Sequence, residues 1–193
     1  MCQVGLWIRD CTPGQRGATL TRWPDSSGIS PPITLPAALF FVMSGCPCTE
    51  ASIREFDRLL EGIDALHRPE VTIIVCGEPD PSFEERLNRI FPFARIRRDL
   101  DGREARRFGA TTSGQLMIFD QGSRVRFSGG ITVARGHEGL SKGSVTVREI
   151  LSRPRSSDEP NRIVEFPVFG CPLPCETADA HSLAKDDAAP GDE

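Results

Sequence analysis

An apolar run that breaks at a pair of cysteines constrains the fold of this chain more than any other stretch. Residues 37–43 (AALFFVM) form an unbroken apolar segment of strand length, which is typical of a strand buried on both faces of a sheet. Cys46, Pro47 and Cys48 follow within three residues. Apolar residues then recur at helical spacing with charged residues between them: Ile53, Phe56, Leu60 and Ile63. The sequence therefore predicts a buried strand, a cysteine turn and an amphipathic helix in direct succession.

The position of the two cysteines indicates thiol chemistry. A helix N-terminus carries partial positive charge and unpaired N–H groups, so it stabilises a thiolate and lowers the pKa of the cysteine. We expect Cys46 to be the more exposed thiol and Cys48 to lie closer to the helix amides, which leaves open which of them attacks. A disulfide between them would close a small, strained ring that is easily reduced. The same spacing suits two thiolates on one soft ion such as Cu(I), and two cysteines without a role remain the third alternative.

The rest of the pattern predicts an α/β domain over residues 34–153. A βαβ unit, a β-hairpin and a closing helix follow one another, which is the thioredoxin arrangement. The fold class expected is thus a thioredoxin-like three-layer α/β/α domain with a mixed central sheet, and the cysteine turn lies where that fold keeps its active site. The later elements are expected as strands at 71–76 and 94–98, helices at about 80–91 and 103–108, hairpin strands at 115–119 and 124–127, and a helix at 144–153.

Two flanking segments differ in composition from this domain. Residues 1–33 are rich in Gly, Pro, Ser and Thr and are predicted to be a loosely ordered lead-in. Residues 154–193 form a Pro-rich, acidic tail that is predicted to be mostly disordered. Within the tail, the apolar segment 164–175 is a candidate to dock on the domain. Docking would place Cys171 and Cys175 near the domain, where either could act as a resolving thiol or as a third soft ligand. A tail without a function is an alternative of equal weight.

Charge and hydropathy argue against a nucleic-acid-binding domain and against a membrane-spanning segment. The tail holds three Lys/Arg and nine Asp/Glu, a net charge of −6, which leaves +2 for residues 1–153 in a chain of total charge −4. A nucleic-acid-binding domain normally shows a strong basic surplus, so none is expected here. The longest apolar run, residues 35–43, is about half of the roughly 20 residues that a membrane span needs. Neither a signal peptide nor a zinc-binding cysteine pattern is visible.

Topology places two further loops beside the cysteines. The first hairpin strand should run antiparallel to the central strand, so residues 111–114 before it start at the cysteine end of the sheet. Thr112 and Ser113 lie there, where thioredoxins keep a cis-proline that this chain lacks. The second hairpin strand returns to the same end and brings the glycine-rich residues 128–143 with it. Arg135 or His137 in that loop would favour a thiolate by its positive charge, and a neutral His137 would accept the thiol proton. Pairing with Glu138 and backbone is the alternative.

Several motifs together resemble bacterial thioredoxin-like proteins of the RedB type. They are residues 46–52 (CPCTEAS), 105–114 (ARRFGATTSG), 127–132 (FSGGIT), 135–139 (RGHEG) and 168–173 (VFGCPL), and the resemblance spans roughly residues 22–175. It implies a thioredoxin-like fold, and such proteins often follow a membrane anchor and face a periplasmic or other extracytoplasmic compartment. This chain has Ser44 and Gly45 where the family often has His-Pro before the first cysteine.

The function predicted from sequence is thiol–disulfide exchange or redox sensing with protein thiols and disulfides as partners and no cofactor. Cys46 or Cys48 attacks and the other resolves the mixed disulfide. A Cu(I)-handling thiol protein is the first alternative, with Cys46 and Cys48 as ligands and Cys171 or His137 as an optional third. A non-catalytic binding module that keeps the fold is the second. Cys76 is expected to be a small buried hydrophobic residue, and no role is assigned to Cys2 or Cys11.

Overall fold

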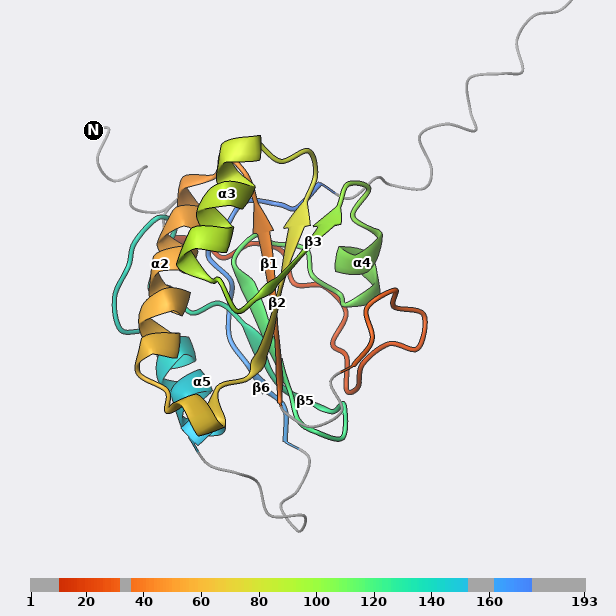
Figure 1. The fold of residues 1–193 in the computed structure, drawn as a ribbon, viewed down its shortest axis with the longest axis vertical. Coiled ribbons are helices and arrows are strands. Elements are labelled where there is room, and N and C mark those ends of the chain that lie inside the picture. The colour runs from red at the N-terminus through yellow and green to blue at the C-terminus, as the bar shows by residue number, and fades with distance from the viewer. Residues whose placement is uncertain (1–10, 32–35, 153–161, 175–193) are drawn as a thin grey trace, which may run out of the picture.

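A mixed six-stranded sheet forms the centre of the computed structural model, which describes residues 11–31, 36–152 and 162–174. Its strand order is β3-β2-β1-β4-β5-β6 (Figure 1). The strands are β1 (Ala37–Met43), β2 (Glu70–Cys76), β3 (Arg95–Asp99), β4 (Gln115–Phe119), β5 (Val125–Gly129) and β6 (Val164–Glu165). The helices are α2 (Pro47–Glu61), α3 (Pro81–Ile90), α4 (Arg103–Arg107) and α5 (Lys142–Ser152), with a 3-10 turn η1 (Ala65–His67).

Strand β1 is an inner strand of the sheet and forms hydrogen-bonded pairs with β2 on one side and with β4 on the other. It runs parallel to β2 and antiparallel to β4, while β3 is parallel to β2 and β5 is antiparallel to β4. Residues 38–42 are completely buried, as expected for a strand covered on both faces. The βαβ unit, the hairpin and the flanking helices form a thioredoxin-like α/β/α fold, and the predicted fold class is confirmed.

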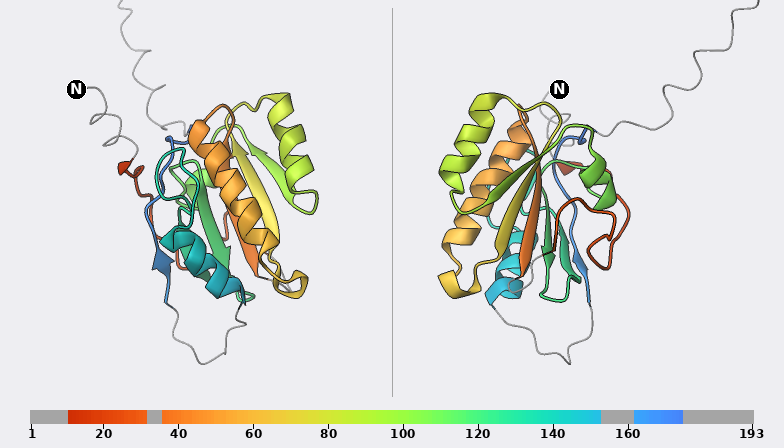
Figure 2. Two further views of the ribbon diagram at one scale, coloured as in Figure 1. Left: turned by 90° about the vertical axis from the view of Figure 1, so that its left-hand side faces the viewer. Right: turned by 45° about the vertical axis from the view of Figure 1, so that its right-hand side comes forward.

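Alternation along β1 divides the core between the two faces of the sheet. Ala38, Phe40 and Val42 pack with α2, α3 and α5, whereas Leu39 and Phe41 contribute to a second cluster on the opposite face. Figure 2 shows α2, α3 and α5 on one face and α4 with residues 11–31 on the other. The cysteine turn follows directly after the end of β1, the strand that lies between these two core clusters.

Part of the N-terminal lead-in packs on the domain. Trp23 is 8% exposed, and its ring meets Phe108 edge-on at a centroid distance of 5.1 Å. The Trp23 indole N–H donates to the carbonyl oxygen of Ile29 at 2.9 Å, which satisfies the polar group of a buried ring. Residues 11–31 thus cover the second core together with α4. Residues 1–10, which include Cys2, lie outside the described ranges.

Two element boundaries differ by two residues from those predicted, whereas the other predicted boundaries agree to within one residue. Helix α5 begins at Lys142, two residues earlier than the predicted residue 144. The Ser144 N–H donates to the Ser141 hydroxyl, and the Ser141 N–H donates to the Ser144 hydroxyl, both at 3.0 Å. This reciprocal capping resembles a capping box in which serine replaces the usual Glu or Gln, and that replacement hid the signal. Strand β5 extends to Gly129 rather than ending at residue 127.

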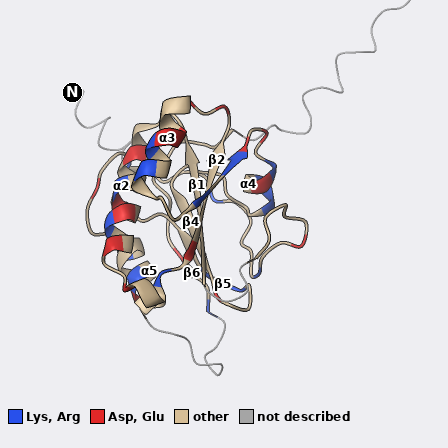
Figure 3. Cartoon of the chain, viewed as in Figure 1, with Lys and Arg blue, Asp and Glu red and all other residues tan. Residues whose placement is uncertain are grey.

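The surface of the described residues carries interspersed charges of both signs. Figure 3 shows Lys/Arg and Asp/Glu mixed along α2 and α3 and around α4. Arginines of the stretch 86–107 form ion pairs, namely Arg86–Glu50, Arg95–Glu70, Arg98–Glu84, Arg103–Asp101 and Arg107–Glu104. Among the described helices, none combines the length and apolar character required to cross a bilayer.

Candidate thiol site

Three cysteine side chains meet at the start of α2. Cys46 is the N-cap residue of this helix, Cys48 lies in its first turn, and Cys171 comes from a segment 125 residues further along the chain than Cys46. The three Sγ atoms lie within 4.8 Å of one another, and those of Cys46 and Cys171 are 2.9 Å apart. All three cysteines are in the free, reduced form.

The local sequence accounts for the position of Cys46. Gly45 adopts φ 73°, a left-handed conformation that favours glycine and turns the chain after β1. Cys46 is extended, with φ −102° and ψ 120°, and its carbonyl oxygen accepts the Glu50 N–H at 3.3 Å. Pro47 occupies the first turn, where its fixed φ suits a helix start and its missing N–H costs nothing. The sulfur of Cys46 therefore stands at the positive end of α2.

The predicted exposures of the two helix-start cysteines are wrong. Cys46 is 3% exposed and Cys48 is 8% exposed, so both are buried and Cys46 is not the more open thiol. Cys48 was also predicted to lie closer to the helix amides, but the backbone N–H groups of Thr49 and Cys48 act on the Cys46 thiol, and no backbone group is among the main causes that shift the pKa of Cys48.

The environment of Cys46 favours its thiolate. Burial raises the pKa of Cys46, but the hydrogen bond with Cys171, the backbone N–H groups of Thr49 and Cys48 and the Thr49 hydroxyl together lower it below its ordinary value of 9.0. The Cys46 side chain forms no capping hydrogen bond of normal geometry. We therefore attribute the backbone effect to N–H dipoles that point toward the sulfur. When Cys46 is deprotonated, the Cys171 S–H is the donor between these two sulfur atoms.

A buried chain of hydroxyl groups extends from Cys46 to the end of β1. The hydroxyl oxygens of Thr49 and Ser113 are 2.5 Å apart, and the Met43 N–H donates to the Ser113 hydroxyl at 3.1 Å. Thr49 and Ser113 are both fully buried. The Ser113 hydroxyl can then donate to the Thr49 hydroxyl oxygen, which leaves the Thr49 O–H to donate to the Cys46 sulfur. Every polar group of this hydrogen-bonded series then has a partner. Ser113 thus positions the hydroxyl that stabilises the thiolate.

The other two thiols are held in the protonated form. Burial raises the pKa of Cys48, and the adjacent negative charge of Cys46 raises it further, while Cys171 and the positive charge of Arg135 lower it in part. Burial, followed by the hydrogen bond and the charge of Cys46, raises the pKa of Cys171 to about 12. Near neutral pH, Cys46 is therefore the most readily ionised thiol of the three and the candidate nucleophile.

Cys171 belongs to a segment that we name the C-terminal strap, residues 162–174. It begins with β6, which pairs in parallel with β5, and continues along the sheet toward the start of α2 (Figure 1). The Ser113 N–H donates to the Cys171 carbonyl oxygen and the Leu173 N–H donates to the Thr111 carbonyl oxygen, each at 2.9 Å. These bonds flank an antiparallel bridge between Thr112 and Pro172. The strap is thus paired by its backbone with the loop of residues 111–114.

Contacts on both sides of Cys171 fix the strap further. A Cβ atom at Gly170 would lie 1.9 Å from the Ser113 carbonyl oxygen, so only glycine allows this approach. The Arg135 guanidinium donates to the carbonyl oxygens of Gly170 and Thr12, the latter at 2.9 Å. Leu173 is 6% exposed and joins the second core cluster. The Cys171 sulfur is therefore presented to Cys46 by a segment anchored before and after it.

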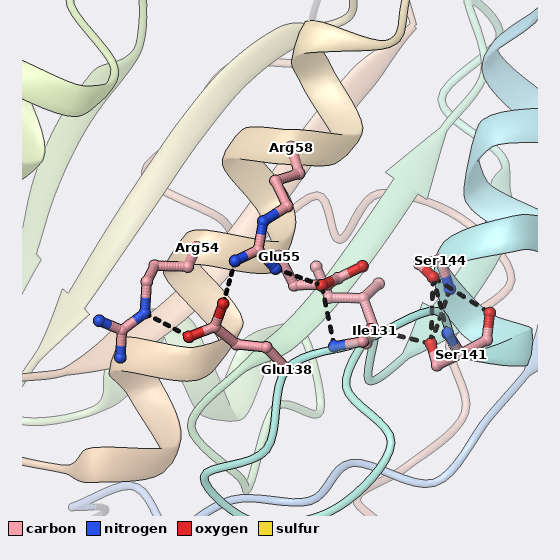
Figure 4. Close-up of polar contacts among 8 residues, drawn as sticks. Arg54, Glu55, Arg58, Ile131, Glu138, Ser141 and Ser144 are labelled. Carbon is pink, nitrogen blue, oxygen red and sulfur yellow. Dashed lines mark hydrogen bonds and ion pairs between the residues drawn. The ribbon is translucent and has the colours of Figure 1, made fainter.

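The glycine-rich loop that carries Arg135 is itself fastened to α2 (Figure 4). Glu138 forms ion pairs with Arg54, at 2.6 Å, and with Arg58, and Glu55 accepts the N–H of Gly139 at 3.2 Å. Figure 4 also shows the loop bound through Ser141 to the carbonyl oxygen of Ile131, at 2.8 Å. Hydrogen bonds to Arg58 lower the pKa of Glu138, so this carboxylate stays charged near neutral pH. This fastening sets the position of Arg135.

The structure brings most of the predicted site residues together. Cys46, Cys48, Cys171 and Ser113 meet at one place, and Arg135 acts on Cys48 by charge while it binds the strap. His137 is exposed, and its Nδ1 lies 2.7 Å from the Arg135 carbonyl oxygen, so its role at the thiols stays a prediction.

Thr112 and the other cysteines take different positions. The Thr112 hydroxyl donates to the Gln15 carbonyl oxygen at 3.1 Å, and its backbone faces Pro172. Cys76 is 1% exposed at the end of β2, and Cys11 is exposed. Cys175 lies outside the described residues.

Sequence reasoning missed two features of the site. One is Thr49, whose position three residues after an N-cap cysteine is a readable signal, because the N3 residue of a helix faces its N-cap. The other is the backbone pairing between residues 111–113 and 171–173. No periodicity marks that pairing, although Gly170 beside a cysteine hints at a close backbone approach.

Comparisons with known proteins bear on the fold. No family model matches the sequence, and no curated protein is similar to it. The structure is similar to a "hypothetical protein" from Sinorhizobium meliloti 1021, with a TM-score of 0.56 and 17% identity over 86% of this chain and 96% of that one. It is also similar to an "uncharacterized conserved protein" from Geobacillus kaustophilus, with a TM-score of 0.57 and 14% identity over 84% of this chain and 92% of that one.

A third solved structure is a secreted Mycobacterium tuberculosis disulfide oxidoreductase homologous to DsbE of E. coli. Its TM-score is 0.43 and its identity 12%, over 61% of this chain and 80% of that one. At this score, nothing about the chemistry of the present chain follows from it.

Proposed function

We propose that this protein is a thiol–disulfide oxidoreductase in which Cys46 is the attacking thiol and protein disulfides are the partners. The observation that carries the proposal is the contact of three free thiols at a helix start, where the environment selects Cys46 as the thiolate. Attack by this thiolate on a partner disulfide gives a mixed disulfide and releases one partner thiolate. A neighbouring thiol then attacks the Cys46 sulfur and releases the second partner sulfur. Cys48 and Cys171 are both close enough to supply it.

The ionisation pattern of the site supports this assignment. A site that ionised all three thiols would place like charges within 4.8 Å, which is unfavourable in a buried setting. Once Cys46 ionises, burial and the charge of Cys46 keep Cys48 protonated, so one thiolate then faces two thiols. That is the charge state needed for attack followed by resolution. The resemblance to RedB-type proteins stays a prediction.

The test is the reduction of a protein disulfide such as that of insulin, with dithiothreitol supplying electrons. Cys46→Ser should lower the rate to that of dithiothreitol alone. Cys11→Ser is the matched control, because Cys11 is an exposed cysteine of the same chain outside the cluster. Its rate should equal that of the unaltered protein. Activity that survives Cys46→Ser would refute the proposal.

The three thiols also favour a second candidate function, the binding of Cu(I). Thiolates are the soft ligands that Cu(I) prefers, and each cysteine offers one sulfur within a triangle no wider than 4.8 Å. Cys46, Cys48 and Cys171 would be the ligands. An anaerobic Cu(I) titration against a competing chelator should then give one copper per chain, and Cys171→Ser should weaken the binding. Equal binding by the triple Cys→Ser variant at these positions would eliminate this candidate.

A further inference from the structure

We propose that Cys171, rather than Cys48, is the resolving thiol, so that the oxidised protein holds a Cys46–Cys171 disulfide. This inference rests on the proposed function and deepens it, because it assigns the second half of the exchange to the C-terminal strap. Arg135 and Gly170 are then positioning residues, since they fix the strap without touching the reacting sulfur atoms of the exchange.

The direction from which each thiol approaches Cys46 favours Cys171. Its Sγ lies 2.9 Å from that of Cys46, about 0.9 Å more than the length of a disulfide bond. Cys48 is separated from Cys46 only by Pro47, and both residues are fixed by the helix start. A bond between these two would close a small ring that includes the rigid proline. Cys171 approaches from a separate segment, so its disulfide with Cys46 closes no small ring.

The anchoring of the strap keeps this approach in place. Backbone hydrogen bonds of 2.9 Å join Cys171 to Ser113 and Leu173 to Thr111. Arg135 holds the carbonyl oxygen of Gly170, immediately before the cysteine. Two groups held in contact react as one molecule, without the entropy cost of an encounter. The strap therefore supplies the second thiol at a high local concentration.

The charge environment of Cys171 also suits the second step of the exchange. In the reduced protein, burial raises the pKa of Cys171, and the hydrogen bond to Cys46 and the Cys46 charge raise it further. Once Cys46 has entered a mixed disulfide, its sulfur carries no charge and is a weak acceptor. Two of the causes that hold the Cys171 proton are then removed. Cys171 thus stays protonated while Cys46 attacks. Cys171 then ionises more easily in the second step, in which it attacks the mixed disulfide.

The exchange consists of two successive thiolate attacks. The Cys46 thiolate breaks the partner S–S bond, forms a Cys46–partner disulfide and expels one partner thiolate, which takes up a proton. Cys171 loses its proton, and its sulfur attacks the Cys46 sulfur, which expels the second partner thiolate. The Cys46–Cys171 bond forms as the mixed disulfide breaks. Two electrons pass from the two cysteines to the partner, which ends as two thiols.

The experiment uses the reduced full-length chain and limiting oxidised glutathione without oxygen. Samples are quenched with acid, blocked with N-ethylmaleimide and mapped by trypsin and mass spectrometry. Cleavage after arginine or lysine leaves Cys46 and Cys48 together on residues 23–54 and places Cys171 on residues 163–185. A Cys46–Cys171 disulfide therefore joins two peptides, whereas a Cys46–Cys48 disulfide stays within one. Fragmentation of the joined peptides identifies the linked cysteines.

We expect the joined peptides in the unaltered protein and in the Cys48→Ser variant. In Cys171→Ser, glutathione should remain on Cys46 for on the order of ten times longer or more, because the positioned thiol is gone. Cys175→Ser is the matched control, four residues further along the chain, and should behave as the unaltered protein.

Two results would overturn the inference in distinguishable ways. A disulfide confined to residues 23–54, with Cys171→Ser clearing glutathione at the unaltered rate, would assign resolution to Cys48 and leave the proposed function intact. The absence of any glutathione adduct on Cys46 in Cys171→Ser and in the Cys48→Ser, Cys171→Ser double variant would remove the proposed function itself. Retention of the far-ultraviolet circular dichroism spectrum confirms that each variant is folded.

Discussion

Replacing Gly170 by alanine tests how the strap is held. The added Cβ would lie 1.9 Å from the carbonyl oxygen of Ser113 and 3.0 Å from its carbonyl carbon. Both are backbone atoms, so no side chain can rotate to make room. Reaching an ordinary nonbonded distance requires a shift of roughly 1 to 2 Å between the strap and the loop of residues 111–114. A shift of that size disrupts backbone hydrogen bonds that are now 2.9 Å long.

The size of the effect follows from what the strap would lose. Two backbone hydrogen bonds contribute about 0.5–1.5 kcal/mol each to the net free energy of unfolding. Leu173 is 6% exposed, and full burial of a leucine contributes about 1.5–3 kcal/mol. A partial loss of both gives a destabilisation of about 2–4 kcal/mol. For a domain of this size, the melting temperature should fall by roughly 5 to 15 °C.

The assay pairs a thermal melt with the rate at which the Cys46–Cys171 disulfide forms. Gly62→Ala is the matched control, because Gly62 ends α2 away from the cysteines and its nearest neighbour, at 3.3 Å, is the mobile end of Arg148. We expect Gly170→Ala to lower the melting temperature and to slow the disulfide by up to roughly thirtyfold, the equivalent of 2 kcal/mol. If Gly170→Ala and Gly62→Ala have equal melting temperatures and equal rates, then the close approach at Gly170 does not hold the strap.

Two further predictions concern ionisation. The alkylation rate of Cys46 should follow a pKa below 9.0, and Cys171→Ala should raise that pKa because the S–H donor is lost, whereas Cys171→Ser keeps a donor and should change it less. The measurement is a pH profile of iodoacetamide labelling, read at Cys46 by mass spectrometry. Identical profiles for the two variants would contradict this prediction. The raised pKa of Cys171, about 12 against 9.0, means that its contribution to stability is fully present below pH 9 and is lost as the pH rises toward 12. The urea concentration at the unfolding midpoint should therefore decrease as the pH is raised from 8 to 11, and it should decrease less in Cys171→Ser. An equal decrease in the unaltered protein and in Cys171→Ser would count against a raised pKa of Cys171.

Local sequence signals were enough to predict the core of the fold. The apolar run of β1 and the helical spacing after it predicted a strand over residues 37–43 and the helix that follows. Both patterns depend on neighbours within one element, where periodicity reports burial directly. The cysteine end of the sheet was also predictable, because strand directions place the loop before β4 beside the end of β1. The Met43 N–H bond to Ser113, at 3.1 Å, is the contact that this reasoning anticipates.

The arrangement of the thiols depends on contacts that no local pattern encodes. Which cysteine is ionised follows from the N-cap position of Cys46, and the boundary of α2 fixes that position to a single residue. The presentation of Cys171 depends on backbone pairing across a long separation in the chain. Hydrogen-bonded pairing of this kind uses main-chain groups that every residue carries, so the side chains give only indirect signals.

Stabilisation of the Cys46 thiolate leads to a last prediction, on the reduction potential. The Thr49 hydroxyl, the Cys171 thiol and the N–H groups of α2 lower the pKa of Cys46 in the reduced protein, and a neutral disulfide sulfur gains much less from them. A protein whose reduced form is stabilised has an oxidising disulfide, so the potential should lie above the roughly −270 mV of thioredoxin. The sequence suggested the same direction from ring strain between Cys46 and Cys48. The structure supplies a different cause that does not require that ring.

Thr49→Val separates the two causes, because it removes the hydroxyl and leaves both cysteines in place. A hydrogen bond to a charged group contributes about 1.5–3 kcal/mol, and 1.4 kcal/mol corresponds to about 30 mV for a two-electron couple. The variant's potential should therefore be about 30 to 60 mV more negative in a glutathione redox titration. Thr72→Val, at a buried threonine of β2, is the control and should leave the potential unchanged. A potential that stays the same in Thr49→Val would mean that the hydroxyl does not stabilise the thiolate, and ring strain would again be the simpler explanation.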